Sequence, residues 1–207
     1  AQGKKVIVVL NNGGAIEVKS WKNKVDAILM AWLPGQEAGN SVADILSGKE
    51  NPSGKLSMTF PVKYEDVSSA DNFQGFPADK PTEVMYKEGV YVGYRYFNTF
   101  NVKPAYEFGY GLSYTTFEYS DMRISDKVFD NELYVSVNVK NTGKVAGKEI
   151  VQLYLSSPTN VIDKPAKELK GFTKTQLLKP GEEQTITLRL TLRDLASFNL
   201  GKSAWVA

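Results

Sequence analysis

The sequence predicts an α/β fold followed by an all-β fold, and three patterns support this prediction. Two apolar runs, Val6–Leu10 and Ala27–Leu33, have the length and composition of strands buried on both faces of a parallel sheet. A helical pattern follows at 36–47. From Thr115 onward, apolar residues recur at every second position, as in antiparallel strands. This change of period divides the chain into two regions of different fold class.

The first region combines strands, a helix and a turn-rich segment. The expected helix Gln36–Ser47 should end at Gly48, a residue type suited to the left-handed C-terminal position. Its apolar face is formed by Ala38, Val42, Ile45 and Leu46. The alternating residues of Leu56–Phe60 predict a further, outer strand. A strand–helix–strand order indicates a parallel sheet with a helix crossover.

The second region is expected to be an antiparallel sandwich, because short alternating strands are separated by turn residues. The predicted strands are Phe117–Ile124, Leu133–Val139, Ile150–Leu155, Leu169–Thr173 and Ile186–Leu192. Between the regions, Pro104–Ser120 contains five aromatic residues interleaved with two glycines. Exposed aromatic surface costs free energy, so we expect this segment to pack on a surface and fix one domain against the other.

Composition excludes several functional classes. The net charge of +2 gives no reason to expect nucleic acid or an anionic membrane as a partner. The chain has no cysteine, which rules out disulfides and thiolate chemistry, and no histidine, so acid–base chemistry would need carboxylates, lysine or tyrosine. No apolar run approaches the ~20 residues that span a bilayer. The sequence leaves the cellular compartment undetermined, and any signal peptide is expected upstream of Ala1.

Two motifs on the predicted helix and its C-terminal turn have plain structural interpretations. Gly48–Leu56 resembles a phosphate-binding loop, but five residues separate its glycines and Leu56 replaces the metal-binding hydroxyl, which favours an ordinary turn. Glu37 and Asp44 share a helix face and could form an acid–base pair. The structural interpretation is favoured, since Glu37 lies in the first turn, where a negative charge interacts favourably with the helix dipole.

An aromatic cluster could line a sugar site, although packing between domains is the favoured interpretation. It consists of Tyr91, Tyr94, Tyr96, Phe97 and Phe100. No role is assigned to Lys140, Asn141 or Asp163, whose spacing is not distinctive.

Six ordered blocks resemble glycoside hydrolase family 3, and specifically its β-glucosidases with a fibronectin type III-like domain. They are Trp32–Pro61 (WLPGQEAGNSVADILSGKENPSGKLSMTFP), Tyr86–Phe97 (YKEGVYVGYRYF), Pro104–Ser120 (PAYEFGYGLSYTTFEYS), Asn141–Pro158, Lys167–Glu182 and Arg193–Asn199. The resemblance covers essentially the whole chain. It implies that residues 1–60 are the C-terminal part of an α/β sandwich domain, 61–114 a connecting segment, and 115–207 an incomplete fibronectin type III-like β-sandwich.

The resemblance implies an enzyme that removes terminal non-reducing β-D-glucosyl residues with retention of configuration and needs no cofactor. It implies that this chain is a structural segment, inactive alone, whose partner is the N-terminal remainder of the same polypeptide. A β-xylosidase of the same family and a non-catalytic carbohydrate- or protein-binding module remain alternatives. The sugar specificity and the oligomeric state are not predicted.

The resemblance implies that no catalytic, cofactor-binding or metal-binding residue lies in this chain. The family's nucleophile is an Asp followed by Trp in an N-terminal barrel, and Ser120-Asp121-Met122 lacks that Trp. Glu37 matches a helix-start Glu that is not the family's acid/base residue. Both chain ends are expected to continue in a longer polypeptide. We therefore expect an open sheet edge and exposed apolar residues near Ile186–Leu192.

Overall fold

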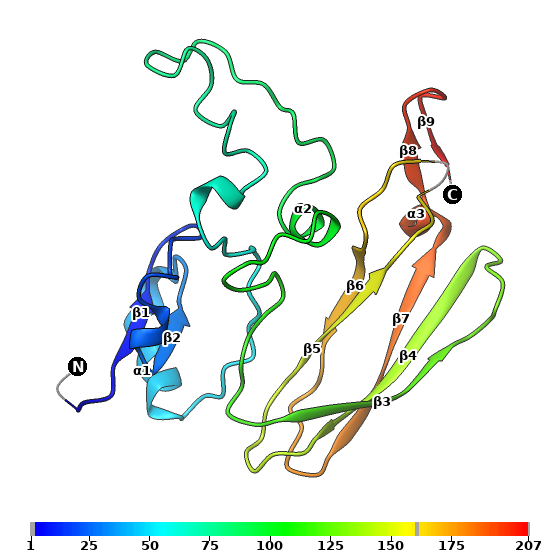
Figure 1. Ribbon diagram of the computed structural model, residues 1–207. Coiled ribbons are helices and arrows are strands. Elements are labelled where there is room, and N and C mark those ends of the chain that lie inside the picture. The colour runs from blue at the N-terminus through cyan, green and yellow to red at the C-terminus, as the bar shows by residue number, and fades with distance from the viewer. Residues whose placement is uncertain (1–2, 160–161, 207) are drawn as a thin grey trace. The chain divides into compact units, whose positions relative to one another are not determined.

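The computed structural model describes residues 3–159 and 162–206 (Figure 1). It is rich in strands and has few helices. Two compact units divide the chain: the first contains residues 1–50 and 56–110, and the second contains 51–55 and 111–207. The segment expected to connect two domains is therefore shared, since it belongs to the first unit through Tyr110 and to the second from Gly111.

The first unit is built around a two-stranded parallel sheet. Strand β1 (Ile7–Leu10) pairs in register with β2 (Ala27–Met30), so that Ile7 lies opposite Ala27. Apolar, β-branched residues dominate both runs, as expected for strands. One face of the pair packs on a core formed by Leu10, Val18 and Phe60, while Ile7 and Val9 on the other face are exposed.

The helix α1 (Ala38–Ser47) follows β2 and begins after a 3₁₀ turn at Gly35–Glu37. Gly48 ends it in the left-handed conformation with φ of 77°, which confirms the predicted cap. The predicted crossover from β2 through α1 to Leu56–Phe60 is wrong, because those residues form no strand. The sheet instead pairs β1 with β2, which are joined by residues 11–26 and the 3₁₀ turn Lys22–Lys24.

The strand predicted at Leu56–Phe60 is absent. Phe60 forms an isolated antiparallel bridge with Tyr106, and the Leu56 N–H donates to the Tyr110 carbonyl at 2.8 Å. The alternation does bury Phe60, but Gly109 at φ of 80° breaks the regularity of the opposing segment, so no continuous ladder forms. The remaining elements of this unit are a 3₁₀ turn at Tyr64–Asp66 and helix α2 (Tyr94–Thr99).

The second unit contains two main antiparallel sheets that share one core. Its strands are β3 (Phe117–Ile124), β4 (Glu132–Asn141), β5 (Ile150–Leu155), β6 (Glu168–Lys174) and β7 (Glu183–Thr191). One sheet has the order β3-β4-β7, and the other pairs β5 with β6 (Figure 1). Val139, Val151, Leu178 and Ile186 form the core between them. All five strands were predicted, because their alternating residues bury one face.

Two details of this unit differ from expectation. Among the described strands β7 does lie at the edge of its sheet, as expected, but Ile186 and Leu190 are buried and only Leu192 of the predicted exposed group lies open to solvent, because the alternating face of β7 points into the shared core. Met122 and Ile124 of β3 are exposed, as is nearly the whole of this edge strand, and a bulge between Ser120 and Arg123 shifts its register with β4. Beyond β7, the chain forms the short helix α3 (Leu192–Leu195) and a hairpin of β8 (Ser197–Asn199) and β9 (Ala204–Val206).

Candidate functional site

The two helix carboxylates considered as an acid–base pair have separate local partners. Glu37 accepts a hydrogen bond from the Asn40 side-chain amide at 2.6 Å. Asp44 is paired with Lys49, whose ammonium lies 3.0 Å from both carboxylate oxygens. Each carboxylate therefore has its own local side-chain partner.

The aromatic cluster packs mainly against itself. Phe97 on α2 is buried, and Phe100 meets both Tyr91 and Tyr96 with ring centroids 5.1 Å apart. Tyr94 instead stacks on Phe108 at 4.8 Å with an interplanar angle of 28°. The cluster therefore supplies the local core of this segment, and Tyr94 also reaches a cavity.

This cavity, in the first unit, has a volume of about 680 Å³. Most of its lining is apolar or aromatic, and its lining residues are Ala15, Ile16, Glu17, Ser57, Met58, Thr59, Pro61, Lys63, Tyr64, Val67, Val92, Gly93, Tyr94 and Phe108. The Thr59 hydroxyl oxygen is enclosed and has no hydrogen-bond partner within the described residues. Ser20 donates its N–H and its hydroxyl to Glu17, and these bonds lower the pKa of the Glu17 carboxyl. A carboxyl whose pKa is lowered by these bonds is a poor candidate for a general acid.

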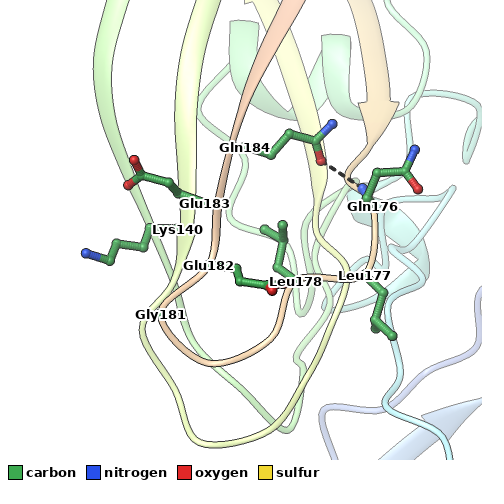
Figure 2. A pocket seen from close by; sticks show the side chains of 8 residues that line it. All are labelled: Lys140, Gln176, Leu177, Leu178, Gly181, Glu182, Glu183 and Gln184. Carbon is green, nitrogen blue, oxygen red and sulfur yellow. Dashed lines mark hydrogen bonds between the residues drawn. The ribbon is translucent and has the colours of Figure 1, made fainter.

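A second cavity of about 770 Å³ lies at the turn before β7 (Figure 2). Figure 2 shows the Gln184 side chain accepting a hydrogen bond from the Gln176 N–H, at 2.8 Å. Lys140, Glu182 and Glu183 also line it, and all three are exposed to solvent. Because solvated charges at a surface turn create no special chemical environment, this cavity supports no reaction.

Asn141, to which no role was assigned from its spacing, is completely buried at the end of β4. Its Oδ1 accepts from the Thr115 hydroxyl at 2.6 Å and from the Gly143 N–H at 3.0 Å. Its Nδ2 donates to the carbonyls of Val145 and Leu178, each at 2.8 Å. Asn141 therefore joins turns of the second unit rather than binding a ligand. In the sequence, Asn141-Thr142-Gly143 indicated only a turn. Lys140 and Asp163 are exposed.

A buried ion pair ties segment 51–55 into the second unit. The Lys55 ammonium lies 2.9 Å from a carboxylate oxygen of Glu149 and also donates to the Gly111 carbonyl at 2.8 Å. Their side chains are only 15% and 11% exposed. Burial and the neighbouring Glu149 raise the pKa of the Tyr119 hydroxyl, which donates to that carboxylate at 3.3 Å. Sequence reasoning missed this network, because Lys55 and Glu149 are far apart in the chain.

Other candidate chemistry is limited. Asp121 lies in the β3 bulge, at φ of 50°. Within the described residues, no group of three or more His, Cys, Asp or Glu side chains is placed to hold a metal ion. No described helix is long and apolar enough to cross a membrane.

Comparisons with known proteins connect these features to a family. A family model described as "Glycosyl hydrolase family 3 C-terminal domain" matches residues 1–94, and one for a fibronectin type III-like domain matches 149–207. The chain is 49% identical over 202 residues to thermostable beta-glucosidase B of Acetivibrio thermocellus, and 43% identical over 209 residues to a beta-glucosidase of Bacteroides ovatus. The chain belongs to glycoside hydrolase family 3.

Solved structures agree with this assignment to glycoside hydrolase family 3. Beta-glucosidase 3B of Thermotoga neapolitana, solved in complex with glucose, matches 96% of the chain with 57% identity and a TM-score of 0.90. The beta-glucosidase of Kluyveromyces marxianus, also in complex with glucose, matches 96% with 42% identity and a TM-score of 0.86.

In the curated relatives, the matched region is a minor part of a longer protein. The match with the Acetivibrio relative covers 97% of this chain but 26% of that protein. The match with the Bacteroides relative covers 99% of this chain but 27% of that protein. It therefore spans about a quarter of the length of the curated relatives it matches, and corresponds to their C-terminal family 3 portion.

Proposed function

We propose that this chain is the C-terminal segment of a retaining β-glucosidase that removes terminal non-reducing β-D-glucosyl residues. The observation that carries the proposal is the high identity, over nearly the whole chain, to proteins named as beta-glucosidases. In a retaining enzyme, one carboxylate attacks the anomeric carbon while a second, ~5–5.5 Å away, acts first as acid and then as base. We place both carboxylates in the polypeptide that precedes Ala1.

In this proposal the chain itself is structural. Residues 1–60 complete an α/β sandwich domain, 61–114 connect it onward, and 115–207 form the fibronectin type III-like sandwich. The local partners of Glu37 and Asp44 support this role, since both carboxylates are engaged by neighbouring side chains. The exposed Ile7 and Val9 support it as well, because parallel sheets are normally covered on both faces.

The test is hydrolysis of an aryl β-D-glucoside, with an aryl β-D-xyloside beside it. We expect no turnover by the 207-residue chain, and glucoside turnover by the longer polypeptide that its gene encodes, with the β-anomer as first product in NMR. Turnover by the short chain that Glu37→Gln abolishes would overturn the structural role. Preference of the long polypeptide for the xyloside would identify the alternative enzyme.

A further inference from the structure

Residues 72–88 of the first unit form a self-organised loop, here called the tongue. The Asn72 side-chain amide donates to the Met85 carbonyl at 2.6 Å and to the Glu88 carboxylate at 3.0 Å, which closes its base. Within it, Phe76 and Glu83 exchange backbone hydrogen bonds of 2.7 and 3.1 Å. These bonds fix the backbone before any partner arrives, which lowers the ordering entropy that binding must offset.

The tongue exposes a cluster of large apolar side chains. They are Phe73, Phe76, Val84, Met85 and Tyr86, of which Tyr86 is 93% exposed. Single exposed apolar residues are common on soluble proteins, whereas a cluster on one ordered loop marks a binding surface.

The apolar cavity of the first unit lies at the root of the tongue. Tyr64 and Val67 precede the tongue in the chain, Val92 and Tyr94 follow it, and all four line the cavity. Thr59 lines it too, and the hydroxyl of Thr59 has no partner within the described residues. A buried hydroxyl without a hydrogen bond is costly, so an occupant that offers a polar group as well as apolar surface fits this cavity.

We propose that the tongue and this cavity form one docking surface for the polypeptide that precedes this chain in the same enzyme. The inference rests on the proposed function, and adds the place of contact. The matched relatives carry about three quarters of their length outside the matched region, so a covalently attached occupant is available. A tethered partner acts at an effective concentration of order mM, which exceeds that of a second copy in solution.

Hydroxyl-radical footprinting with mass spectrometry tests the surface. We expect Tyr86 and Phe76 to be oxidised readily in the 207-residue chain and several-fold more slowly in the longer polypeptide. Phe172 on β6, exposed and far from the tongue in sequence, serves as the reference. Equal oxidation of Tyr86 in both polypeptides would overturn the proposal. Protection of Tyr86 in the 207-residue chain would overturn it as well. Protection that is lost on dilution would identify a second copy of the chain as the occupant, and protection that persists would identify the chain's own second unit.

Substitution gives an independent readout. Tyr86→Lys should lower the melting temperature of the longer polypeptide and leave that of the 207-residue chain unchanged, with Phe172→Lys as the matched control. An unchanged melting temperature of the longer polypeptide would contradict the docking role of Tyr86. Glucoside hydrolysis is measured separately. If Tyr86 is protected in the longer polypeptide but that polypeptide hydrolyses no glucoside, the proposed function is rejected while the docking surface is supported.

Discussion

At the scale of single residues, Asn141 shows how a buried polar group organises the second unit. Its amide bonds to Thr115, Gly143, Val145 and Leu178, so one side chain joins three separate segments. A buried amide is tolerated only when its hydrogen bonds are made, and here each half of the amide makes two. Gly143 is required beside it, because a Cβ there would collide with Thr115.

Replacing Asn141 by alanine should destabilise the second unit strongly. The change removes the amide partner of the Thr115 hydroxyl, the Gly143 N–H and the Val145 carbonyl, whereas the Leu178 carbonyl keeps the Gly147 N–H. Each buried group left unsatisfied costs ~1–3 kcal/mol. We expect a loss of at least about 3 kcal/mol in the free energy of unfolding, measured by urea titration. The neighbouring exposed Lys140→Ala is the control, and a similarly small effect of both variants would contradict this role of Asn141.

At the scale of elements, alternation and capping account for most of the second unit. Leu133 lies opposite Leu190 and Val137 opposite Ile186, so the alternating residues of β4 and β7 meet in register. After β7, the Thr191 N–H and hydroxyl both donate to the Asp194 carboxylate, at 2.7 and 2.6 Å. These bonds start α3 at the residue where the strand ends.

The Asp194 carboxylate should make stability depend on pH. The hydrogen bonds from Thr191 lower the pKa of Asp194 in the folded chain, so this group stabilises the fold above its unfolded pKa of about 3.9. The contribution is lost as the pH falls through the lower, folded pKa. We expect Asp194→Asn to cost ~0.5–1 kcal/mol at pH 7.

The check on Asp194 is urea unfolding at pH 7 and at several values below pH 4. The difference between wild type and Asp194→Asn should shrink as the pH falls. Lys140→Ala, which removes an exposed side chain on β4 and changes no carboxylate, should show no such trend. A difference that stays constant or grows toward low pH would refute the role of Asp194.

At the scale of the whole molecule, the two units have separate cores of different kinds. The first is built on Leu10, Val18 and Phe60 beside a two-stranded sheet, and includes the irregular residues 61–93. The second has antiparallel ladders around Val139 and Ile186, and the β4–β7 ladder runs without a register shift. Segments with few ladder hydrogen bonds open more readily than core strands, so local stability should differ between the units.

Limited trypsin digestion of the 207-residue chain should therefore cut first at Lys87, which is exposed within the tongue and is not followed by proline. Cleavage after Arg189 in β7 should be much slower, because β7 must unpair from β4 before the protease can bind it. Mass spectrometry of early fragments gives the order. Early cleavage within β7, before the tongue, would show that the second unit is the less stable one.

The sequence by itself determined that the chain is rich in strands, the positions of strands β1 to β7, the helix α1 with its Gly48 cap, and the family, because periodicity, turn residues and ordered sequence blocks are local properties of the chain. Only the tertiary structure decided that β1 and β2 pair directly, that Leu56–Phe60 is no strand, and that the Lys55–Glu149 pair draws 51–55 into the second unit. The tongue and the cavity at its root also emerged only there. These features join residues far apart in sequence, and their hydrogen bonds and burial depend on which segments meet in space rather than on local propensity.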